Sequence, residues 1–523
     1  MKISFLDFAV ILIYFAATLA VGYMVGRRSQ STGQYFLANK SFSGWAIGIS
    51  LIGSIISSVT FLGIPADSFK TAWLRFLPNL ALPIVALIAA RYFVPFFRRG
   101  TITSAYEYLA LRFGGSISTY AAIAFLLTQV LRTSVIAYLL SLLLEGITGW
   151  GFATCLLVTV GITAVYTVKG GIKAVVWTDV VQTIVLLLGV VVCIVYIVDA
   201  LPAGLATIFS DANAHHKLSV AHDYNTATAS LERVGTGFSL SEKTVLMLLI
   251  AGFVQYLGGQ FEQSTVQRWC VATTAAEARR SVYVMGFGCV PVWALFQFLG
   301  TALFVYFLHF PDPVAGEIAA GTRKAESIVP YFITEFLPTG LRGLVIAGAL
   351  AAAMSTLSAC INSASMVIVN DLYKKIGPAR SDGHYLAVAK GAALAVSLLM
   401  IGGALLIYTA ETVTLTDLIL TLVALISSGV PGIFLAGMLT RRVSLAGAWT
   451  GLAASLLFVL WVKANDLGLT PDALRFGLFP YYVAIVGNVL SFGVAYLASL
   501  VRPAPTQALS NLTVWDQAET PLE

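Results

Sequence analysis

A run of small and hydroxyl residues at 347–363 carries the clearest chemistry in this sequence. If the run is helical, positions 352, 355, 356 and 359 share one face. A sodium ion is a hard cation that needs several oxygen ligands at once. The hydroxyls of Ser355 and Thr356 and the carbonyl of Ala352 offer three. Hydroxyl residues in membrane helices also bond to their own backbone, which leaves a purely structural interpretation open.

Two further segments place small and polar residues where lipid-facing positions would be apolar. Residues 44–60 are rich in glycine and serine, and residues 255–262 combine a glycine pair with two amides and a carboxylate. Glycine-interrupted membrane helices at corresponding positions are the best sequence pointer to a transporter's binding site. We therefore expect two broken helices, and carbonyls near Gly53 and Ile56 that complete the oxygen shell. Close packing of small-residue helices is the alternative.

Charged residues also stand inside apolar segments, where each costs at least about 2.5 kcal/mol near the bilayer centre. Arg132 carries a planar guanidinium that fits a carboxylate. That carboxylate belongs either to a bound solute or, in a structural ion pair, to Glu262. Asp179 follows a segment at 170–178 and either ligates a cation or anchors its own helix.

The composition requires a membrane around these residues. Of 523 residues, 58% are hydrophobic and only 11% are charged, a balance that a soluble domain of this size cannot carry. Apolar runs of about twenty residues recur along the chain. We expect about thirteen spans, near residues 6–26, 43–66, 76–97, 118–146, 151–168, 174–199, 243–266, 281–309, 340–372, 386–408, 413–438, 443–462 and 478–501.

The spans group into one membrane transporter domain at 1–502. An extra N-terminal helix at 6–26 precedes two sets of five helices, at 43–199 and 243–438, which is the arrangement of an inverted repeat. Two C-terminal helices follow at 443–501. Residues 503–523 are polar and aperiodic and are expected to form a disordered cytoplasmic tail. A polar loop at 200–242 and a second loop at 310–340, expected to hold an amphipathic or re-entrant helix, lie between spans.

Lys and Arg set the orientation. Alternate breaks between spans hold eighteen and eleven of them, the first set including Arg268, while Arg91 and Arg132 fall within spans. Because cytoplasmic loops hold the excess, we expect the N-terminus outside and the C-terminus inside. The net charge of +6 comes without a basic and aromatic cluster, so we expect no nucleic acid partner. We expect no enzyme, because the five histidines do not converge with a cysteine or carboxylate pair, and no obligate protein partner.

Three segments carry a resemblance to a known family. They are residues 170–182, the alanine-rich segment that runs from Ser355 to Tyr373, and Val266-Gln267-Arg268. The chain resembles the sodium/solute symporter family, which includes sodium/glucose cotransporters and bacterial sialic acid symporters. The resemblance implies an all-α membrane protein of the amino-acid/sodium symporter fold, with thirteen helices and alternating access. It also implies location in a bacterial inner membrane.

The resemblance further implies ligand sites. It assigns a common sodium site to Gly53, Ile56, Ala352, Ser355 and Thr356. A second sodium site would involve Asp179, Ser355 and Ser358, but Ala359 stands where a ligating serine is usual, so this site is expected to be weak or completed by water. Energetics favour two sodium ions, because a second ion makes transport of an anion electrogenic. The solute site falls on Ser57, Thr60, Asn79, Arg132 and Gln255.

Sialic acid or another acidic sugar is the leading substrate, because residues 102–109 and Arg132 look closest to the sialic acid branch. A neutral sugar or polyol is second, and a small monocarboxylate is third. The expected ligands are therefore Na⁺ and a small organic solute, with the lipid bilayer as the surroundings. A transporter-like sensor and a membrane-embedded enzyme are the alternatives from other classes.

Overall fold

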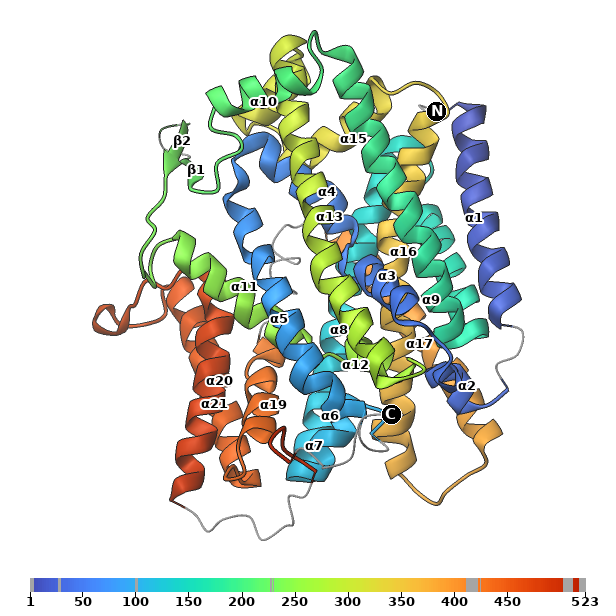
Figure 1. Ribbon diagram of the computed structural model, residues 1–523, viewed down its shortest axis with the longest axis vertical. Coiled ribbons are helices and arrows are strands. Elements are labelled where there is room, and N and C mark those ends of the chain that lie inside the picture. The colour runs from blue at the N-terminus through green and yellow to red at the C-terminus, as the bar shows by residue number, and fades with distance from the viewer. Residues whose placement is uncertain are drawn as a thin grey trace.

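The computed structural model describes residues 4–26, 30–98, 102–225, 228, 230–410, 422–423, 425–501 and 511–516. In these residues nine helices are long and apolar enough to cross a membrane, and two bent helix pairs bring the number to eleven. The molecule is a bundle of such helices, with short elements at both ends (Figure 1). The predicted multi-pass helical architecture is confirmed.

The first part of the chain is helical almost throughout. Its helices are α1 (Phe5–Gly26), α2 (Thr32–Leu37), α3 (Gly44–Ile55), α4 (Ser58–Lys70), α5 (Leu82–Ile88), α6 (Val94–Arg98), α7 (Ala105–Phe113), α8 (Gly115–Thr148), α9 (Phe152–Ala200) and α10 (Leu205–Ala214). A 3-10 segment, η2 (Trp73–Ala81), leads into α5, and a π-helical turn, η3 (Ala89–Phe93), joins α5 to α6. Together these last pieces form the predicted third span.

The second part repeats the pattern of long helices separated by short ones. Its helices are α11 (Val245–Gly259), α12 (Gln263–Cys270), α13 (Ala275–His309), α14 (Pro313–Ala320), α15 (Ile328–Glu335), α16 (Leu341–Val367), α17 (Asp382–Thr409), α19 (Val430–Leu439), α20 (Leu445–Asp466) and α21 (Val483–Leu500). The predicted span at 413–438 lies partly outside the described residues. Of the expected tail at 503–523 only 511–516 are described, and there the indole of Trp515 donates to the carbonyl of Leu439 at 2.7 Å.

Both glycine-interrupted spans are broken, as the sequence predicts. The axes of α3 and α4 differ by 62°, and those of α11 and α12 differ by 57°. At the first break Ile56 takes an extended backbone (φ −85°, ψ 102°), which ends α3. At the second break Glu262 is extended and starts α12. Helix ends leave backbone groups without intrahelical partners, so each break places free polar groups inside the bundle.

A single glycine bends the longest helix. α9 runs for 49 residues, and Gly171 within it has φ 57° and ψ −151°, a conformation that favours glycine. A Cβ at this position would overlap the backbone carbonyl of Tyr35 on α2. The bend lies between the two spans predicted at 151–168 and 174–199.

The short elements collect at the two ends of the bundle. α10, α15 and a small hairpin lie at one end, and α2, α6 and α7 lie at the other (Figure 1). The hairpin pairs β1 (His222–Asn225) with β2 (Ser230–Arg233) in antiparallel register. This strand pair forms outside the apolar spans, in the polar loop predicted at 200–242. The second long loop contains α14 and α15, as its apolar residues predict.

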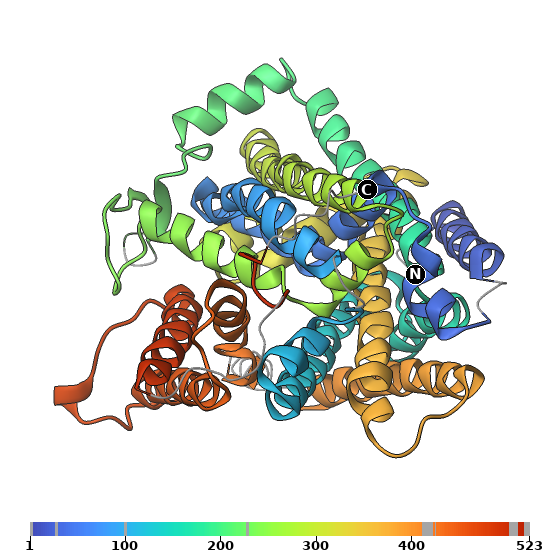
Figure 2. The same cartoon turned by 60° about the horizontal axis from the view of Figure 1, so that its bottom comes forward.

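α16 is the central helix of the bundle. In its most apolar stretch 94% of the residues are buried by protein, compared with 22% in α1. It packs against α9, α8, α1 and α17, and its C-terminal end passes into a π-helical turn, η5 (Ile368–Leu372). α20 and α21 pack on each other at one side of the bundle, seen clearly from below (Figure 2). α16 thus carries its hydroxyl residues in the interior, away from lipid.

Candidate cation and solute sites

The hydroxyls of α16 meet the broken end of α3. Ser355 Oγ donates to the carbonyl of Gly53 at 2.7 Å and lies 3.1 Å from that of Ala352. Thr356 Oγ1 lies 3.2 Å from the carbonyl of Ser54 and 3.3 Å from that of Ala352. Each hydroxyl therefore contacts a carbonyl of its own helix, as in the structural interpretation, and a carbonyl of α3, as expected for a cation site.

The break explains why α3 offers these carbonyls. Because the helix ends at Ile55, its last carbonyls have no amide of a following turn to accept from. The C-terminal end of a helix also carries partial negative charge, which favours a cation. Gly53 lets α3 approach α9, since a Cβ there would lie 2.5 Å from Thr183 Oγ1. Ile56 is fully buried at the same break.

The structure thus brings four of the five residues of the expected sodium site into direct contact, with Ile56 at the adjoining break. It also adds the carbonyl of Ser54, which the sequence did not single out. The cluster offers hydroxyl and carbonyl oxygens and no net charge. Such a donor set suits a hard monovalent cation, which needs oxygen ligands but little charge compensation.

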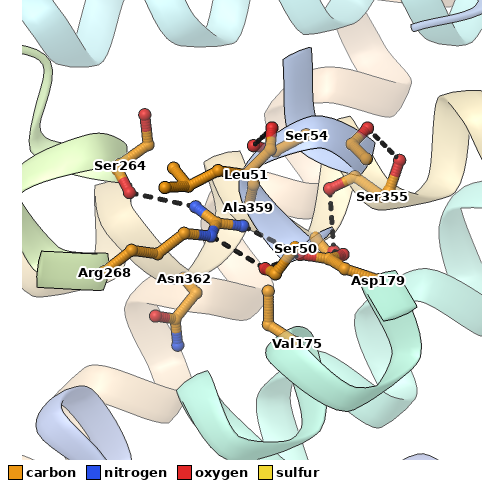
Figure 3. A network of polar contacts seen from close by, with 12 residues as sticks. Ser50, Leu51, Ser54, Val175, Asp179, Ser264, Arg268, Ser355, Ala359 and Asn362 are labelled. Atoms are coloured by element: carbon orange, nitrogen blue, oxygen red, sulfur yellow. Dashed lines mark hydrogen bonds and ion pairs between the residues drawn. The ribbon is translucent and has the colours of Figure 1, made fainter. Parts of the chain in front are cut away.

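A second polar cluster lies beside the first and centres on Asp179 (Figure 3). Its carboxylate pairs with the guanidinium of Arg268 at 2.9 Å, and both side chains are at most 1% exposed. Ser50 Oγ donates to the same carboxylate at 2.6 Å and accepts from Arg268 Nε at 2.9 Å. Arg268 also donates to the carbonyl of Ser264 at 3.0 Å. Asp179 therefore has a resident cation as its partner.

Of the serines expected at the second sodium site, Ser358 contacts this carboxylate and Ser355 contacts Ser358. Ser358 Oγ lies 3.4 Å from Asp179 Oδ1 and donates to the carbonyl of Ser355 at 3.0 Å. Ser355 itself links this cluster to the first. Ala359 lies near the network without a polar side chain (Figure 3). In this arrangement the carboxylate is shared between Arg268 and two serines.

The assignment of Arg268 to a cytoplasmic loop is wrong. The apolar run ends near Val266, so counting placed Arg268 beyond the span, whereas it lies on α12, inside the bundle. Ser50 was not singled out at all. A buried aspartate needs a partner, and this requirement, together with the Val266-Gln267-Arg268 motif, was the available signal for the pair.

Arg132 faces Glu262 across the second break. The guanidinium nitrogen Nη2 lies 3.7 Å from Glu262 Oε2, and the same nitrogen donates to Gln129 Oε1 at 3.0 Å. Gln129 Nε2 in turn lies 3.3 Å from Glu262 Oε2. The side chain of Arg132 is 45% exposed and that of Glu262 is 39% exposed. The alternative partner that the sequence offered is therefore present, in an open and accessible contact.

The other expected solute residues lie near the two breaks. Ser57 is the N-cap of α4 and Thr60 follows in its first turn, both partly buried. Asn79 lies in η2 and accepts a hydrogen bond from the hydroxyl of Tyr256 at 2.5 Å. Gln255 is the exposed neighbour of Tyr256 on α11. Tyr256 was missed because an aromatic residue in an apolar run gives no polar signal.

Comparison with known proteins identifies the family of this chain. The model of the sodium:solute symporter family matches residues 35–454. A sodium/sialic acid symporter of Aliivibrio fischeri is 27% identical over 94% of this chain and 93% of its own length. A sodium/glucose cotransporter of Vibrio parahaemolyticus is 29% identical over 94% of this chain and 91% of its own length.

Solved structures agree at the level of the fold. The substrate-bound, outward-open structure of a sodium-coupled sialic acid symporter superposes with a TM-score of 0.84 at 26% identity, covering 96% of this chain and all of that one. A nucleobase-cation-symport-1 family transporter in a closed conformation gives a TM-score of 0.52 at 14% identity, covering 90% of this chain and 94% of that one, which concerns the fold alone.

With helices broken at two places, hydroxyls of α16 facing one break and a family match across most of its length, this chain belongs to the sodium:solute symporter family. It is a multi-pass membrane transporter that couples the movement of a small solute to sodium. It is not an enzyme.

Proposed function

We propose that the protein imports an acidic sugar such as sialic acid, driven by sodium bound between α3 and α16. The observation that carries the sodium site is the contact of Ser355 and Thr356 with the carbonyls of Gly53 and Ser54 at the broken end of α3. A bound ion would be coordinated by the two hydroxyl oxygens and these carbonyl oxygens, with the hydroxyl hydrogens turned away from it, and would join the two helices. Sodium would thereby stabilise one arrangement of the broken helix α3–α4, whose second half carries Ser57 and Thr60.

The acidic substrate is supported by Arg132 and by the similarity to sialic acid symporters. We assign Ser57, Thr60, Asn79 and Gln255 to the same solute site, because Ser57 and Thr60 follow the first break and Asn79 bonds to Tyr256, the neighbour of Gln255 on α11. A monocarboxylate is the second candidate. It shares the carboxylate that Arg132 would bind, and sodium-coupled monocarboxylate transporters are 27–28% identical over 86–90% of this chain.

A second sodium ion at Asp179, Ser355 and Ser358 belongs to the same proposal as a weak site. Arg268 already compensates the carboxylate, so a sodium ion has to compete with a resident guanidinium at 2.9 Å. Ala359 adds no oxygen there. The second ion would therefore bind only when Arg268 shifts away from Asp179 or when the sodium concentration is high.

We further propose thirteen crossings in a bacterial inner membrane, with the N-terminus outside and the C-terminus inside. A helix of 49 residues is about 74 Å long at 1.5 Å per residue, more than twice the thickness of the hydrocarbon core. Two crossings of α9, divided at Gly171, and one crossing at 413–438 would raise the number to thirteen. The matching breaks of α3–α4 and α11–α12 support two inverted repeats of five helices.

Sodium-dependent uptake of labelled sialic acid into proteoliposomes tests the proposal. Replacing both Ser355 and Thr356 by alanine removes two ligands, each worth about 1.5–3 kcal/mol when the partner is charged, so sodium affinity should fall at least about 100-fold. Ser363→Ala is the matched control, because Ser363 Oγ bonds only within α16, to Ala359 and Cys360 carbonyls. Equal uptake in sodium and choline buffers, or an unaffected double variant, would contradict the sodium site.

A further inference from the structure

We propose that Glu262 selects the solute by accepting hydrogen bonds from hydroxyl or amide groups that stand beside the carboxylate bound to Arg132. This inference rests on the proposed function, because it assumes an acidic solute at Arg132. It goes further by naming a residue outside the expected solute site and by deciding between two classes of acid. Polyhydroxylated acids would be accepted, and simple monocarboxylates would be disfavoured.

The carboxylate of Glu262 is free for such a role. Glu262 stands at the start of α12, yet its side chain makes no capping hydrogen bond to that helix. Its Oε2 contacts Gln129 at 3.3 Å and Arg132 at 3.7 Å. Charge-assisted hydrogen bonds between arginine and carboxylate are normally about 2.7–2.9 Å long. The two charges thus face each other with Gln129 between them, without closing into a direct bond.

A second arginine and carboxylate pair in the same bundle shows what a closed structural pair looks like here. Arg268 and Asp179 are 2.9 Å apart and at most 1% exposed, whereas Arg132 and Glu262 are 45% and 39% exposed. Charged groups within a membrane protein face the bundle interior or a water-filled space, because contact with lipid is costly. The open pair is therefore the one that an entering solute can reach.

The charges of this pair determine which acid fits. A carboxylate that binds Arg132 comes close to Glu262, and the two negative groups repel each other. With only that carboxylate and a short apolar tail, a monocarboxylate leaves Glu262 without a new partner. A solute with hydroxyl or amide hydrogens next to its carboxylate can donate to Glu262 while Arg132 binds the acid. Such a solute satisfies both charges, and an acidic sugar has this arrangement of groups.

Competition measurements on the purified full chain in proteoliposomes test this. Labelled sialic acid is taken up in sodium buffer, and its inhibition by unlabelled sialic acid and by pyruvate is compared in wild type, Glu262→Gln and Glu317→Gln. Glu317 on α14 is the matched control, since its contact with Arg323 is similarly long at 3.9 Å and both side chains are at least half exposed. We expect Glu262→Gln to raise the inhibition constant of sialic acid at least tenfold and to lower that of pyruvate. Both constants in Glu317→Gln should match those of wild type.

The outcomes separate the two proposals. If wild type takes up sialic acid but the ratio of the two inhibition constants is unchanged in Glu262→Gln, the role of Glu262 is overturned and the acidic substrate stands. A wild type that takes up neither acid in sodium overturns the acidic substrate, and the role of Glu262 with it. If Glu262→Gln does not fold, Glu262→Asp keeps the charge on a shorter side chain. We then expect a smaller loss of sialic acid affinity with pyruvate still excluded, and an increase in pyruvate affinity would overturn the inference.

Discussion

Replacing Arg268 by glutamine should cost about 3–5 kcal/mol of folding free energy, the usual cost of removing one partner of a buried ion pair. The carboxylate of Asp179 would remain fully buried, with Ser50 at 2.6 Å and Ser358 at 3.4 Å as its remaining partners. Two neutral donors compensate a buried charge less well than a guanidinium at 2.9 Å. Most of this cost is the penalty of the unpaired charge, so it should be recovered when the charge is also removed.

Thermal unfolding of the purified protein in detergent measures this effect. We expect Arg268→Gln to lower the apparent Tm by several degrees at a fixed scan rate, and the double variant with Asp179→Asn to regain most of the loss. Arg280→Gln is the control, because Arg280 contacts Glu277 at 3.7 Å with 59% of its side chain exposed, and exposed pairs contribute about 0–1 kcal/mol.

Sodium provides a second measurement on the same variants. Without Arg268 the carboxylate is free to bind a cation with the hydroxyl of Ser358. Added sodium should therefore raise the Tm of Arg268→Gln more than that of wild type. The reasoning is refuted if Arg268→Gln unfolds at the wild-type temperature, or if the double variant is as unstable as the single one.

Three further predictions concern charge movement, the loop at 200–242 and helix packing. If the second sodium site is weak, the charge moved per sialic acid on solid-supported membranes should rise with sodium concentration, and a constant ratio would count against it. Burial lowers the pKa of Lys217 from about 10.5 to about 7. Between these pH values the unfolded loop binds more protons than the folded loop, so the folded loop becomes more stable as the pH rises. Hydrogen-exchange protection near Lys217, corrected for the intrinsic rate, should therefore rise from pH 7 to pH 9, and it should not do so in Lys217→Met. Gly252→Ala should lower the Tm more than Gly316→Ala, because a Cβ on Gly252 overlaps the carbonyl of Pro78 whereas Gly316 has open space.

The surroundings of Lys217 explain why its pKa is lowered. Its ammonium donates to the carbonyls of Phe69 at 2.6 Å and Thr71 at 2.8 Å, at the C-terminal end of α4, and lies over the ring of Phe304. The site offers acceptors but little water, which disfavours the charged form. Deprotonation leaves hydrogens for both carbonyls, so the loop gains stability as the pH rises through the lowered pKa.

The sequence predicted the helices better than it predicted their partners. Long apolar runs and glycine-rich segments located the spans and both breaks, because hydropathy and glycine act locally along the chain. The same reasoning placed Arg268 in a loop, since a charge next to the end of an apolar run looks solvated. Its partner Asp179 is 89 residues away in the sequence, and a pattern read over neighbouring residues cannot link two positions so far apart.

For the residues of the expected solute site, too, the sequence indicates the residues better than their partners. Both interpretations of Arg132 were open from the sequence, and the structure shows the contact with Glu262 without excluding a bound acid. Tyr256 and Ser54 contribute through a hydroxyl and a backbone carbonyl that become visible only once the broken helices face their neighbours. The sequence indicates such backbone groups only indirectly, through the glycine-rich segments that break the helices.

The small side chains of α16 have a consequence for the speed of the transport cycle. From Ala347 to Ala359 this buried helix is mostly alanine, glycine and serine, side chains with few or no rotamers to lose. A neighbouring helix that slides along such a surface does not have to pull interlocked side chains out of grooves. The central helix thus presents a smooth surface, along which α3 and α9 can shift at little cost in side-chain entropy once the ion between α3 and α16 has left.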